Sequence, residues 1–547
     1  MQQLHSLVLI SLLSFTCQAA DQTILQQEQM SSDVAEKPLV VIIPSYKNSQ
    51  WYQLNLDSIF NQKYSNYRVI YIDDCSPDGT GDLVQQYIHD HGLEHKITLI
   101  KNEVRQGALS NIYRAIHMCK DFEIMVTVDG DDWLKGDFVF ARLNQAYADP
   151  KVWMTYGQYE DYPHGNQGNQ KALPQGIIIK NVYREYDWVT SHLRTFYAGL
   201  FKKIKLEDFL FEGSFFDVTW DMAFMFPMLE MSREHACFIP EVLYVYNQAT
   251  PSNDFKTKLA RQIHCDHLIR AKDKYQKLST LSFENTQKST IDVIIFSFTS
   301  PVYLYALLES MQSKLHGAND IKVLYYAADQ AREDAYQAIK EIYPTHTFIA
   351  CTATNVKEKM IATLDDCKAP YILLAHDGIV VTRDVDLQLV AHDLEKTHAH
   401  GFYLTLGKNI KKNGALVVEQ KTPPSVWLEN GTYAWQFNHG EHDWRRPFST
   451  SMVVYNKESH LDSLQDLYFK TPQDLQEAWN SMNVSLAQVG LYFEESKAFA
   501  REPEKRERKL AELVALFNAG FKLDENKLKD IQNKSMVVTH DVLFIKR

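Results

Sequence analysis

Short apolar runs alternate with helix-compatible stretches through the first half of the chain. Runs rich in valine and isoleucine occupy Pro38–Pro44, Tyr67–Ile72 and Phe122–Val128, and turn-forming residues follow them. Such runs are typical of buried strands, and the stretches between them are compatible with helices, for example over residues 81–90 and 108–120. Alternating strands and helices predict an α/β domain built on a parallel sheet.

The same pattern returns about 250 residues later along the chain. The run "IDVIIFSFTS" from Ile291 corresponds to "LVVIIPSYKN" from Leu39, and "YILLAHDGIVV" from Tyr371 corresponds to "EIMVTVDGDDW" from Glu123. The spacing between corresponding runs is nearly constant, as a tandem duplication with small insertions and deletions requires. We therefore expect two similar α/β domains in tandem.

The N-terminus and the stretches between these runs define the expected domain organisation. An apolar run from Leu7 to Phe15, followed by small residues, is typical of a secretory signal peptide, although no Lys or Arg precedes it. A buried or frayed N-terminal segment is the alternative. We expect a signal peptide at 1–20, a linker at 21–37, α/β domains at 38–253 and 290–495, a helical connector at 254–289 and a C-terminal helical extension at 496–547. The extension should contain a helix that stops near Gly520, a short helix and the edge strand "MVVTHDVLFIK".

Composition narrows the class of protein. A chain of 547 residues with 45% hydrophobic and 23% charged residues is typical of a soluble protein with two or three domains. The formal net charge of −12 disfavours a broad basic surface for nucleic acid, but it leaves room for a local basic pocket that binds a phosphate. The cysteines show no metal-ligand spacing, and no later apolar run reaches membrane-spanning length.

Acidic residues cluster where two of the predicted strands end. Asp73 and Asp74 end one strand, and Asp129, Asp131 and Asp132 end another. Ligands of open α/β sheets bind at the carboxyl ends of the strands. Like charges so close together need a cation or hydrogen-bond donors, and a site made of carboxylates favours Mg²⁺ or Mn²⁺ over zinc. A solvated acidic loop that caps the next helix is the alternative.

The motifs together resemble the family 2 glycosyltransferases, which are nucleotide-sugar enzymes of the GT-A fold. The resemblance runs from about Leu39 to Asn247, and its motifs are "VVIIPSYKN", "DDCSPDGT", "RQGALSN", "VDGDDWL" and "FIPEVLYVYN", in the family's order. It implies tandem GT-A, Rossmann-like domains, of which the second is degenerate.

The resemblance also implies roles for the acidic residues. Asp131, helped by Asp129, would bind the metal that bridges the donor diphosphate. Asp74, with Asp73 beside it, would accept a hydrogen bond from the nucleotide base, against which Tyr46 would pack.

Two further residues complete the donor side that the resemblance implies. Pro44, at the end of the first strand, would border the donor. Arg105 would contact a phosphate or the sugar, with a solvated surface position as the alternative.

The catalytic base is expected further along the chain, in "FFDVTWDMAFMF". By resemblance to the family, Asp221 stands where the base belongs, and Trp220 replaces the glutamate expected beside it. Asp217 is the close competitor. For either aspartate, a position at a helix N-cap or in the first turn is the structural alternative.

The second domain departs from the family pattern. Ala327 and Ala328 replace the first acidic pair, and Ile379 stands where the second domain should match Asp131, although Asp377 remains. We expect this domain to keep the fold without the metal site. The aromatic stretch Tyr433–Ser449 is either a sugar-stacking surface or a buried tryptophan-rich loop.

We therefore expect an inverting, metal-dependent glycosyltransferase that is non-processive, because the Gln-x-x-Arg-Trp element of processive synthases is absent after Asp221. The donor would be a nucleotide-diphospho-sugar, with a UDP-sugar favoured, and the acceptor a carbohydrate, a lipid-linked molecule or a protein. The alternatives are an inactive glycan-binding or scaffolding protein and a nucleotidyltransferase. The N-terminus predicts a secreted or periplasmic protein. A cytoplasmic location is the alternative, because nucleotide sugars are made in the cytosol.

Overall fold

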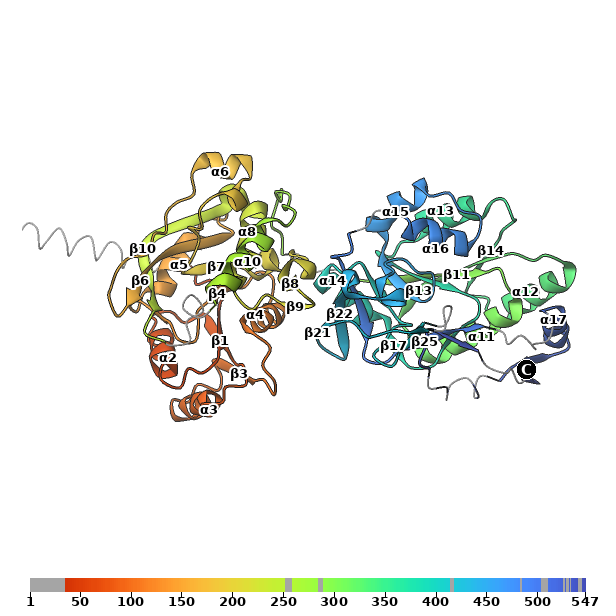
Figure 1. Cartoon of the computed structure of the whole chain (residues 1–547), viewed down its shortest axis with the longest axis horizontal. Coiled ribbons are helices and arrows are strands. Elements are labelled where there is room, and N and C mark those ends of the chain that lie inside the picture. Colours follow the sequence, from red (N-terminus) through yellow and green to blue (C-terminus); the bar gives the residue numbers. More distant parts are fainter. Residues whose placement is uncertain are drawn as a thin grey trace, which may run out of the picture. The chain divides into compact units, whose positions relative to one another are not determined.

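The computed structural model describes most of the chain (Figure 1). The described residues are 35–250, 258–283, 289–413, 418–482, 485–502, 510–524, 527, 531, 533–539 and 544–547. They form two compact units: unit 1 runs to Ile204 and resumes over Phe216–Phe283, and unit 2 comprises Lys205–Phe215 and the chain from residue 284 onward. The predicted signal peptide and nearly all of the linker lie outside the described residues, so export stays a prediction.

Unit 1 is built on an eight-stranded sheet in the order β3-β2-β1-β4-β7-β6-β10-β5. Its strands are β1 (Leu39–Ser45), β2 (Tyr67–Asp73), β3 (Ile97–Lys101), β4 (Ile124–Thr127), β5 (Trp133–Leu134), β6 (Met154–Tyr162), β7 (Arg194–Tyr197) and β10 (Ala236–Asn247). The first four are parallel, as predicted, and β7 runs antiparallel to both β4 and β6. Every residue of β1 is buried, which explains its uninterrupted apolar sequence.

Helices flank this sheet. The helices of unit 1 are α2 (Tyr52–Phe60), α3 (Thr80–Asp90), α4 (Ala108–His117), α5 (Val139–Tyr147), α6 (Gln175–Lys180), α7 (Ala198–Phe201), α8 (Trp220–Ser232) and α10 (Leu259–Arg270). Helix α8 is buried almost all round, which fits its run of Met and Phe. The alternation of strand and helix up to β4 confirms the α/β fold class predicted from the apolar runs.

Helix α10, predicted as part of a connector, is tied to unit 1 by a buried ion pair. Arg184 donates to Glu230 on α8 through Nε, at 2.5 Å, and through Nη2, at 2.9 Å, and its Nη1 donates to the carbonyl of Ile269 at 2.6 Å. Both side chains of the ion pair are almost fully buried. Each buried charge therefore depends on the other, and together they hold the end of α10 against α8.

Unit 2 contains a nine-stranded sheet in the order β14-β13-β11-β15-β23-β18-β24-β22-β21. Its strands are β11 (Ile291–Ser297), β13 (Ala318–Tyr325), β14 (Thr347–Ala350), β15 (Tyr371–His376), β18 (Gly401–Tyr403), β21 (Ser425–Trp427), β22 (Thr432–Gln436), β23 (Val453–Asn456) and β24 (Val489–Phe493). The order and direction of the first seven strands in this sheet repeat those of unit 1, with β11 in the place of β1 and β15 in the place of β4. This repeated topology is what a tandem duplication predicts.

The other elements of unit 2 surround this sheet. Its longer helices are α11 (Pro301–Lys314), α12 (Gln330–Ile342), α13 (Val356–Asp366), α14 (Leu387–Thr397), α15 (Lys457–Asp466), α16 (Pro472–Asn480) and α17 (Leu510–Asn518). Helix α17 ends just before Gly520, as expected. The predicted edge strand is instead two short strands with different partners: β27 (Val537–Thr539) pairs with β25 (Ala498–Glu502), and β28 (Phe544–Lys546) pairs with β26 (Phe521–Leu523). Within the described residues, no helix is both long and apolar enough to cross a membrane.

Asp377, the acidic residue that unit 2 keeps, holds the turn that precedes helix α11. Its Oδ2 accepts hydrogen bonds from the backbone N–H groups of Thr299, at 2.8 Å, and Ser300, at 3.0 Å, just before α11. Burial, partly offset by these hydrogen bonds, raises the pKa of Asp377. The residue therefore has a structural role that needs no metal.

We expect Asp377→Ala to lower the free energy of unfolding of the protein by about 1–2 kcal/mol, because the N–H groups of Thr299 and Ser300 lose their acceptor and that of Ser300 is buried. The stabilisation of the full-length protein by a nucleotide sugar with Mn²⁺ should not change, because unit 1 supplies the predicted metal site. Thermal unfolding with and without donor measures both. Asp365→Ala, at an exposed position, is the control. Loss of the donor effect in Asp377→Ala would contradict a purely structural role.

His400 makes the stability of unit 2 sensitive to acid. Its ring is buried against Phe448 and His460, at centroid distances of 4.8 Å and 4.7 Å. Burial, followed by the charge of His460, holds the pKa of His400 well below its ordinary value, and burial also lowers the pKa of His460. In the unfolded chain both rings take up a proton as the pH falls through about 6.5.

Between about pH 6.5 and the lower pKa values of His400 and His460 in the folded protein, the unfolded chain binds more protons than the folded protein does. The free energy of unfolding therefore decreases as the pH falls through this range. We expect the melting temperature to drop between pH 7.5 and pH 5.5, and to drop less in His400→Phe. Differential scanning calorimetry at both pH values measures the difference. His392→Gln, at an exposed position, should behave like the wild type. An equal drop in His400→Phe would show that His400 does not cause the acid sensitivity.

Candidate functional site

A cavity of about 920 Å³ in unit 1 opens where β1 and β4 end. Pro44 and Tyr46 line it from the end of β1, and Asp129 and Asp131 line it from the turn after β4. Other lining residues come from the donor-side loop, from β7, and from helices α8 and α10: Arg105, His192, Arg194, Trp220, Asp221, Gln262, Asp266 and His267. The sequence analysis did not predict a contribution from α10.

Asp129 lies between two basic side chains. Its Oδ2 is 3.5 Å from Nε2 of His192 and 3.7 Å from Nη2 of Arg194. Burial alone would raise the pKa of Asp129, but the hydrogen bond from His192 and the charge of Arg194 outweigh it and lower the pKa. Asp129 is therefore a carboxylate that remains ionised although it lies inside the unit.

Asp132 fixes the turn that carries the acidic residues. It is 1% exposed, and it accepts hydrogen bonds from the hydroxyl of Tyr244 and from the backbone N–H of Asn247, each at 2.7 Å. Burial, followed by the charges of Asp131 and Asp129, raises the pKa of Asp132 well above its ordinary value. The protein's own hydrogen-bond donors thus balance only part of the negative charge of this turn. A bound cation would balance the rest.

His192 is a site residue that sequence reasoning missed. Its ring stacks on Tyr244 at a centroid distance of 4.6 Å and on Tyr246 at 5.5 Å, and both tyrosines belong to β10. Burial, followed by the charge of Arg194, lowers the pKa of His192. The imidazole is therefore neutral at physiological pH. With its proton on Nδ1, which is 2.8 Å from Oγ of Ser191, Nε2 would offer a lone pair to a metal ion in place of the hydrogen bond to Asp129.

Arg194 connects the acidic turn to the predicted base. It pairs directly with Thr127 across β7 and β4, which places its side chain beside the turn after β4. Its Nη1 donates to Oδ2 of Asp221 at 2.9 Å, and its Nη2 lies 3.7 Å from Asp129. One buried guanidinium therefore balances two carboxylates that are far apart in the sequence.

The structure separates the two candidates for the catalytic base. Asp221 is in the first turn of α8 and lines the cavity. The side chain of Asp217 is 46% exposed, accepts a hydrogen bond from Nε of Arg261 at 3.0 Å, and is not among the residues that line the cavity. Of the two, only Asp221 lines the cavity.

The donor-side loop is held by Asp74. Its oxygens accept hydrogen bonds from the side chain of Asn102 and from the backbone N–H groups of Gln106 and Gly107, all at 2.8 Å. The structure shows that neither Asp73 nor Asp74 lines the cavity, although Oδ1 of Asp73 is buried without a hydrogen-bond partner among the described residues. The loop they support carries Arg105.

Arg105 and Tyr46 form a pair at the cavity wall. The guanidinium of Arg105 lies 3.9 Å above the centre of the Tyr46 ring, which is a cation–π contact. Both residues line the cavity, so the structure brings together two donor-side residues that the sequence predicted separately.

The acidic turn provides a fitting set of ligands for a divalent metal. Oxygen atoms of Asp129 and Asp132 and a ring nitrogen of His192 all lie within 4.8 Å of one another, and among the described residues no other group of this kind occurs. Asp131 lines the same cavity but does not belong to that group. Carboxylate and imidazole ligands suit Mn²⁺ and Mg²⁺, and the charge around Asp132 favours a cation there.

Comparisons with known proteins agree with this site. Residues 40–209 match the sequence model of the family described as Glycosyl transferase family 2. The glycosyltransferase GlyA of Streptococcus pneumoniae is 23% identical over 39% of this chain and 31% of its own length. The putative teichuronic acid biosynthesis glycosyltransferase TuaG of Bacillus subtilis is 31% identical over 18% of this chain and 38% of its own length. The chain thus covers only about a third of each of these two relatives.

Two solved structures are also similar to part of the chain. The mannosyltransferase PcManGT from Pyrobaculum calidifontis, in complex with GDP-Man and Mn²⁺, is 20% identical over 44% of this chain and 68% of its own, with a TM-score of 0.31. Residues 1–349 of S. aureus TarS, in complex with UDP-GlcNAc, are 17% identical over 39% of this chain and 60% of their own, with a TM-score of 0.29. The sequence match is the stronger finding: residues 40–209 of this chain match the model of glycosyl transferase family 2.

Proposed function

We propose that unit 1 transfers a sugar from a nucleoside-diphosphate donor to an acceptor hydroxyl, with inversion and with the help of a divalent metal. The observation that carries the proposal is the arrangement in one cavity of an acidic turn, Arg194 and Asp221. The match of residues 40–209 to family 2 supports it independently. Unit 2 lacks a comparable group of metal ligands among its described residues, which favours unit 1 as the seat of the reaction.

The donor side is formed by the acidic turn and the loop of Arg105. Asp129 and His192, with Asp132 from the same group, would hold Mn²⁺ or Mg²⁺, and Asp131, which lines the same cavity, would join them by resemblance to the family. Such an ion, when bound, neutralises charge that develops on a diphosphate leaving group. Arg105 lies over the ring of Tyr46, and both residues line the same wall of the cavity. Tyr46 would pack against the nucleotide base, and Arg105 would contact a phosphate or the sugar. A uridine nucleotide is favoured by resemblance to the family.

The acceptor side is formed by α8 and α10. Asp221 takes the proton from the attacking hydroxyl, and Arg194 fixes the carboxylate through its 2.9 Å hydrogen bond. A single displacement by that hydroxyl inverts the anomeric centre and needs no covalent intermediate. Trp188, Trp220 and Ile263 add apolar surface to the same cavity, against which a sugar ring packs through its C–H faces.

A thermal-shift screen of the full-length protein against nucleotide sugars tests this proposal. A ligand that binds only the folded state raises the melting temperature. We expect a UDP-sugar with Mn²⁺ to raise it, and expect little effect from the same donor with EDTA. No shift with any donor of the panel would contradict the proposal and favour the alternative of a scaffolding protein.

A further inference from the structure

The aromatic stretch Tyr433–Ser449 belongs to the core of unit 2. Trp435 and Trp444 are fully buried, with their ring centroids 5.2 Å apart, and Trp444 also packs edge to face on Tyr492 at 4.9 Å. The idea that these rings form a sugar-stacking surface is therefore wrong for both tryptophans. Basic residues of the same stretch lie outside this core, beside a cavity.

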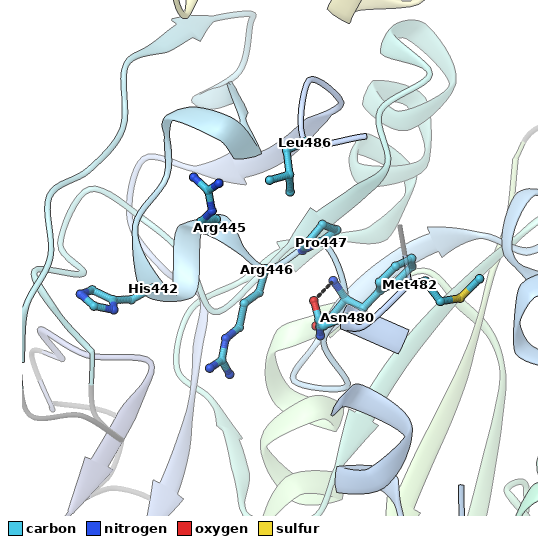
Figure 2. A pocket seen from close by; sticks show the side chains of 8 residues that line it. His442, Arg445, Arg446, Pro447, Asn480, Met482 and Leu486 are labelled. Carbon is cyan, nitrogen blue, oxygen red and sulfur yellow. Dashed lines mark hydrogen bonds between the residues drawn. The ribbon is translucent and has the colours of Figure 1, made fainter. Parts of the chain in front are cut away.

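A cavity of about 310 Å³ lies beside this buried loop (Figure 2). One wall is the loop, and the other is the end of α16 with the residues that follow it. The loop contributes His442, Arg445, Arg446, Pro447 and Phe448, and the other wall contributes Asn480, Met482 and Leu486. Figure 2 shows that Arg445 extends toward the side of Leu486, while Arg446 extends the other way. Two guanidinium groups therefore flank a floor that is mainly apolar.

The backbone that carries these arginines is held firmly. Nε1 of Trp435 donates to the carbonyl of Trp444 at 2.8 Å, and Gly440 packs so closely on Trp444 that a Cβ there would collide with its backbone. Asn480 binds Phe448 twice, accepting from its N–H at 3.2 Å and donating to its carbonyl at 2.7 Å. The two walls of the cavity are thus fixed to each other, so little order has to be gained when a ligand binds.

The charge of this cavity is positive although the whole chain has a formal net charge of −12. The neighbouring carboxylate of Asp443 accepts hydrogen bonds from Asn413 at 2.6 Å and from Gln420 at 2.9 Å. Burial raises the pKa of Asp443, and the nearby charge of Arg446 opposes part of that rise, so Asp443 offsets some of the positive charge. Arg445 has one weak contact, to the carbonyl of Asn438 at 3.4 Å, and both arginines are exposed to solvent. Their N–H groups are therefore largely available to an anion.

We propose that this cavity of unit 2 binds the anionic group of a phosphate- or carboxylate-bearing sugar. Arginine forks match the planar oxygens of a carboxylate and the oxygens of a phosphate, and the apolar floor of Pro447 and Leu486 suits the C–H face of an attached ring. The cavity is at the lower end of the range of small-molecule sites, about 300–1,000 Å³, which fits one ring with its charged group. The choice of a sugar rests on the proposed function, whereas the anion site does not.

Calorimetric titration of the full-length protein, in EDTA and without nucleotide, tests this inference. The probes are trigalacturonate for the carboxylate, glucose 6-phosphate for the phosphate, and maltotriose as the neutral sugar. We expect one or both anionic probes to bind, with an affinity that falls as salt is added, and expect no binding of maltotriose. In the double variant Arg445→Gln with Arg446→Gln, the Kd of the bound probe should rise about 10-fold or more.

A matched variant removes the same charge elsewhere. Lys180→Gln with Lys203→Gln changes two exposed lysines of unit 1 and should bind the probes like the wild type. Equal weakening in both double variants, no weakening in the arginine variant, or binding of neither anionic probe would overturn the inference. The donor-induced thermal shift of the arginine variant should stay intact. If the wild type binds neither anionic probe but keeps its donor-induced thermal shift, this inference fails and the proposed function stands; probe binding without any donor shift is the reverse case.

Discussion

Replacing Asp221 by asparagine is expected to slow sugar transfer by about 10²-fold or more, which is the range expected for the loss of a general base. Asparagine keeps an oxygen that accepts from Nη1 of Arg194, so the cavity should keep its shape and its affinity for the donor. Turnover with acceptor, compared with the donor-induced thermal shift of the same variant, separates the two effects.

Asp217→Asn provides the matched control for this substitution, because it removes the same charge four residues earlier, at a carboxylate that lies outside the cavity lining. We expect it to transfer sugar at close to the wild-type rate. If Asp217→Asn loses transfer and Asp221→Asn keeps it, the assignment of the base is reversed.

The second large effect is expected from Asp131→Asn, which should abolish metal-dependent activity while the fold is kept. The change removes a carboxylate from the cavity wall, and it also removes a charge that contributes to the raised pKa of Asp132. Repulsion within the turn therefore decreases, so the melting temperature without metal should not fall. Activity should fall by more than about 10²-fold, because even groups that only orient metal ligands are worth about 10–100-fold.

Asp137→Asn is the control for Asp131→Asn. Asp137 is 43% exposed and forms a surface ion pair with Lys63, so its loss should change little. Equal turnover of Asp131→Asn and the wild type in Mn²⁺ would show that the metal, if one is used, is held by Asp129, Asp132 and His192 without Asp131.

The parallel part of both sheets was predictable from the sequence, because buried parallel strands are apolar runs such as "LVVII" and "VIIF". The acidic turn was predictable for a related reason, since polar residues directly after such a strand lie at the ligand-binding edge of the sheet. The same reasoning located Asp129 and Asp131, whereas Pro44 and Tyr46 were expected from the resemblance to the family; all four line the cavity.

His192 and Arg194 were not predictable in this way. Arg194 begins a short antiparallel strand, β7, of only four residues, and His192 lies two residues before it. The sequence of β7 gives no sign that it pairs with β4. A lone histidine and a lone arginine are usual surface residues, and only the pairing of Arg194 with Thr127 brings them to the acidic turn. The missing information was the pairing of β4 with β7, two strands that are far apart in the sequence.

The aromatic loop of unit 2 shows a different reason for failure. Tryptophans suit both a buried core and a sugar-binding surface, so composition does not distinguish the two. The structure distinguishes the two possibilities. Trp444 packs closely against Gly440 and is buried in the core, whereas Arg445 and Arg446 are exposed at the surface.

Phosphorus NMR of the full-length protein, incubated with Mn²⁺ and a nucleotide sugar, tests whether unit 1 transfers sugar with a divalent metal. We expect release of the nucleoside diphosphate, which depends on Mn²⁺ and is lost in Asp131→Asn. Release of a sugar 1-phosphate with transfer of the nucleotide would identify a nucleotidyltransferase instead. That outcome, or the absence of any metal-dependent release across a panel of UDP- and GDP-sugars, would rule out metal-dependent sugar transfer by unit 1.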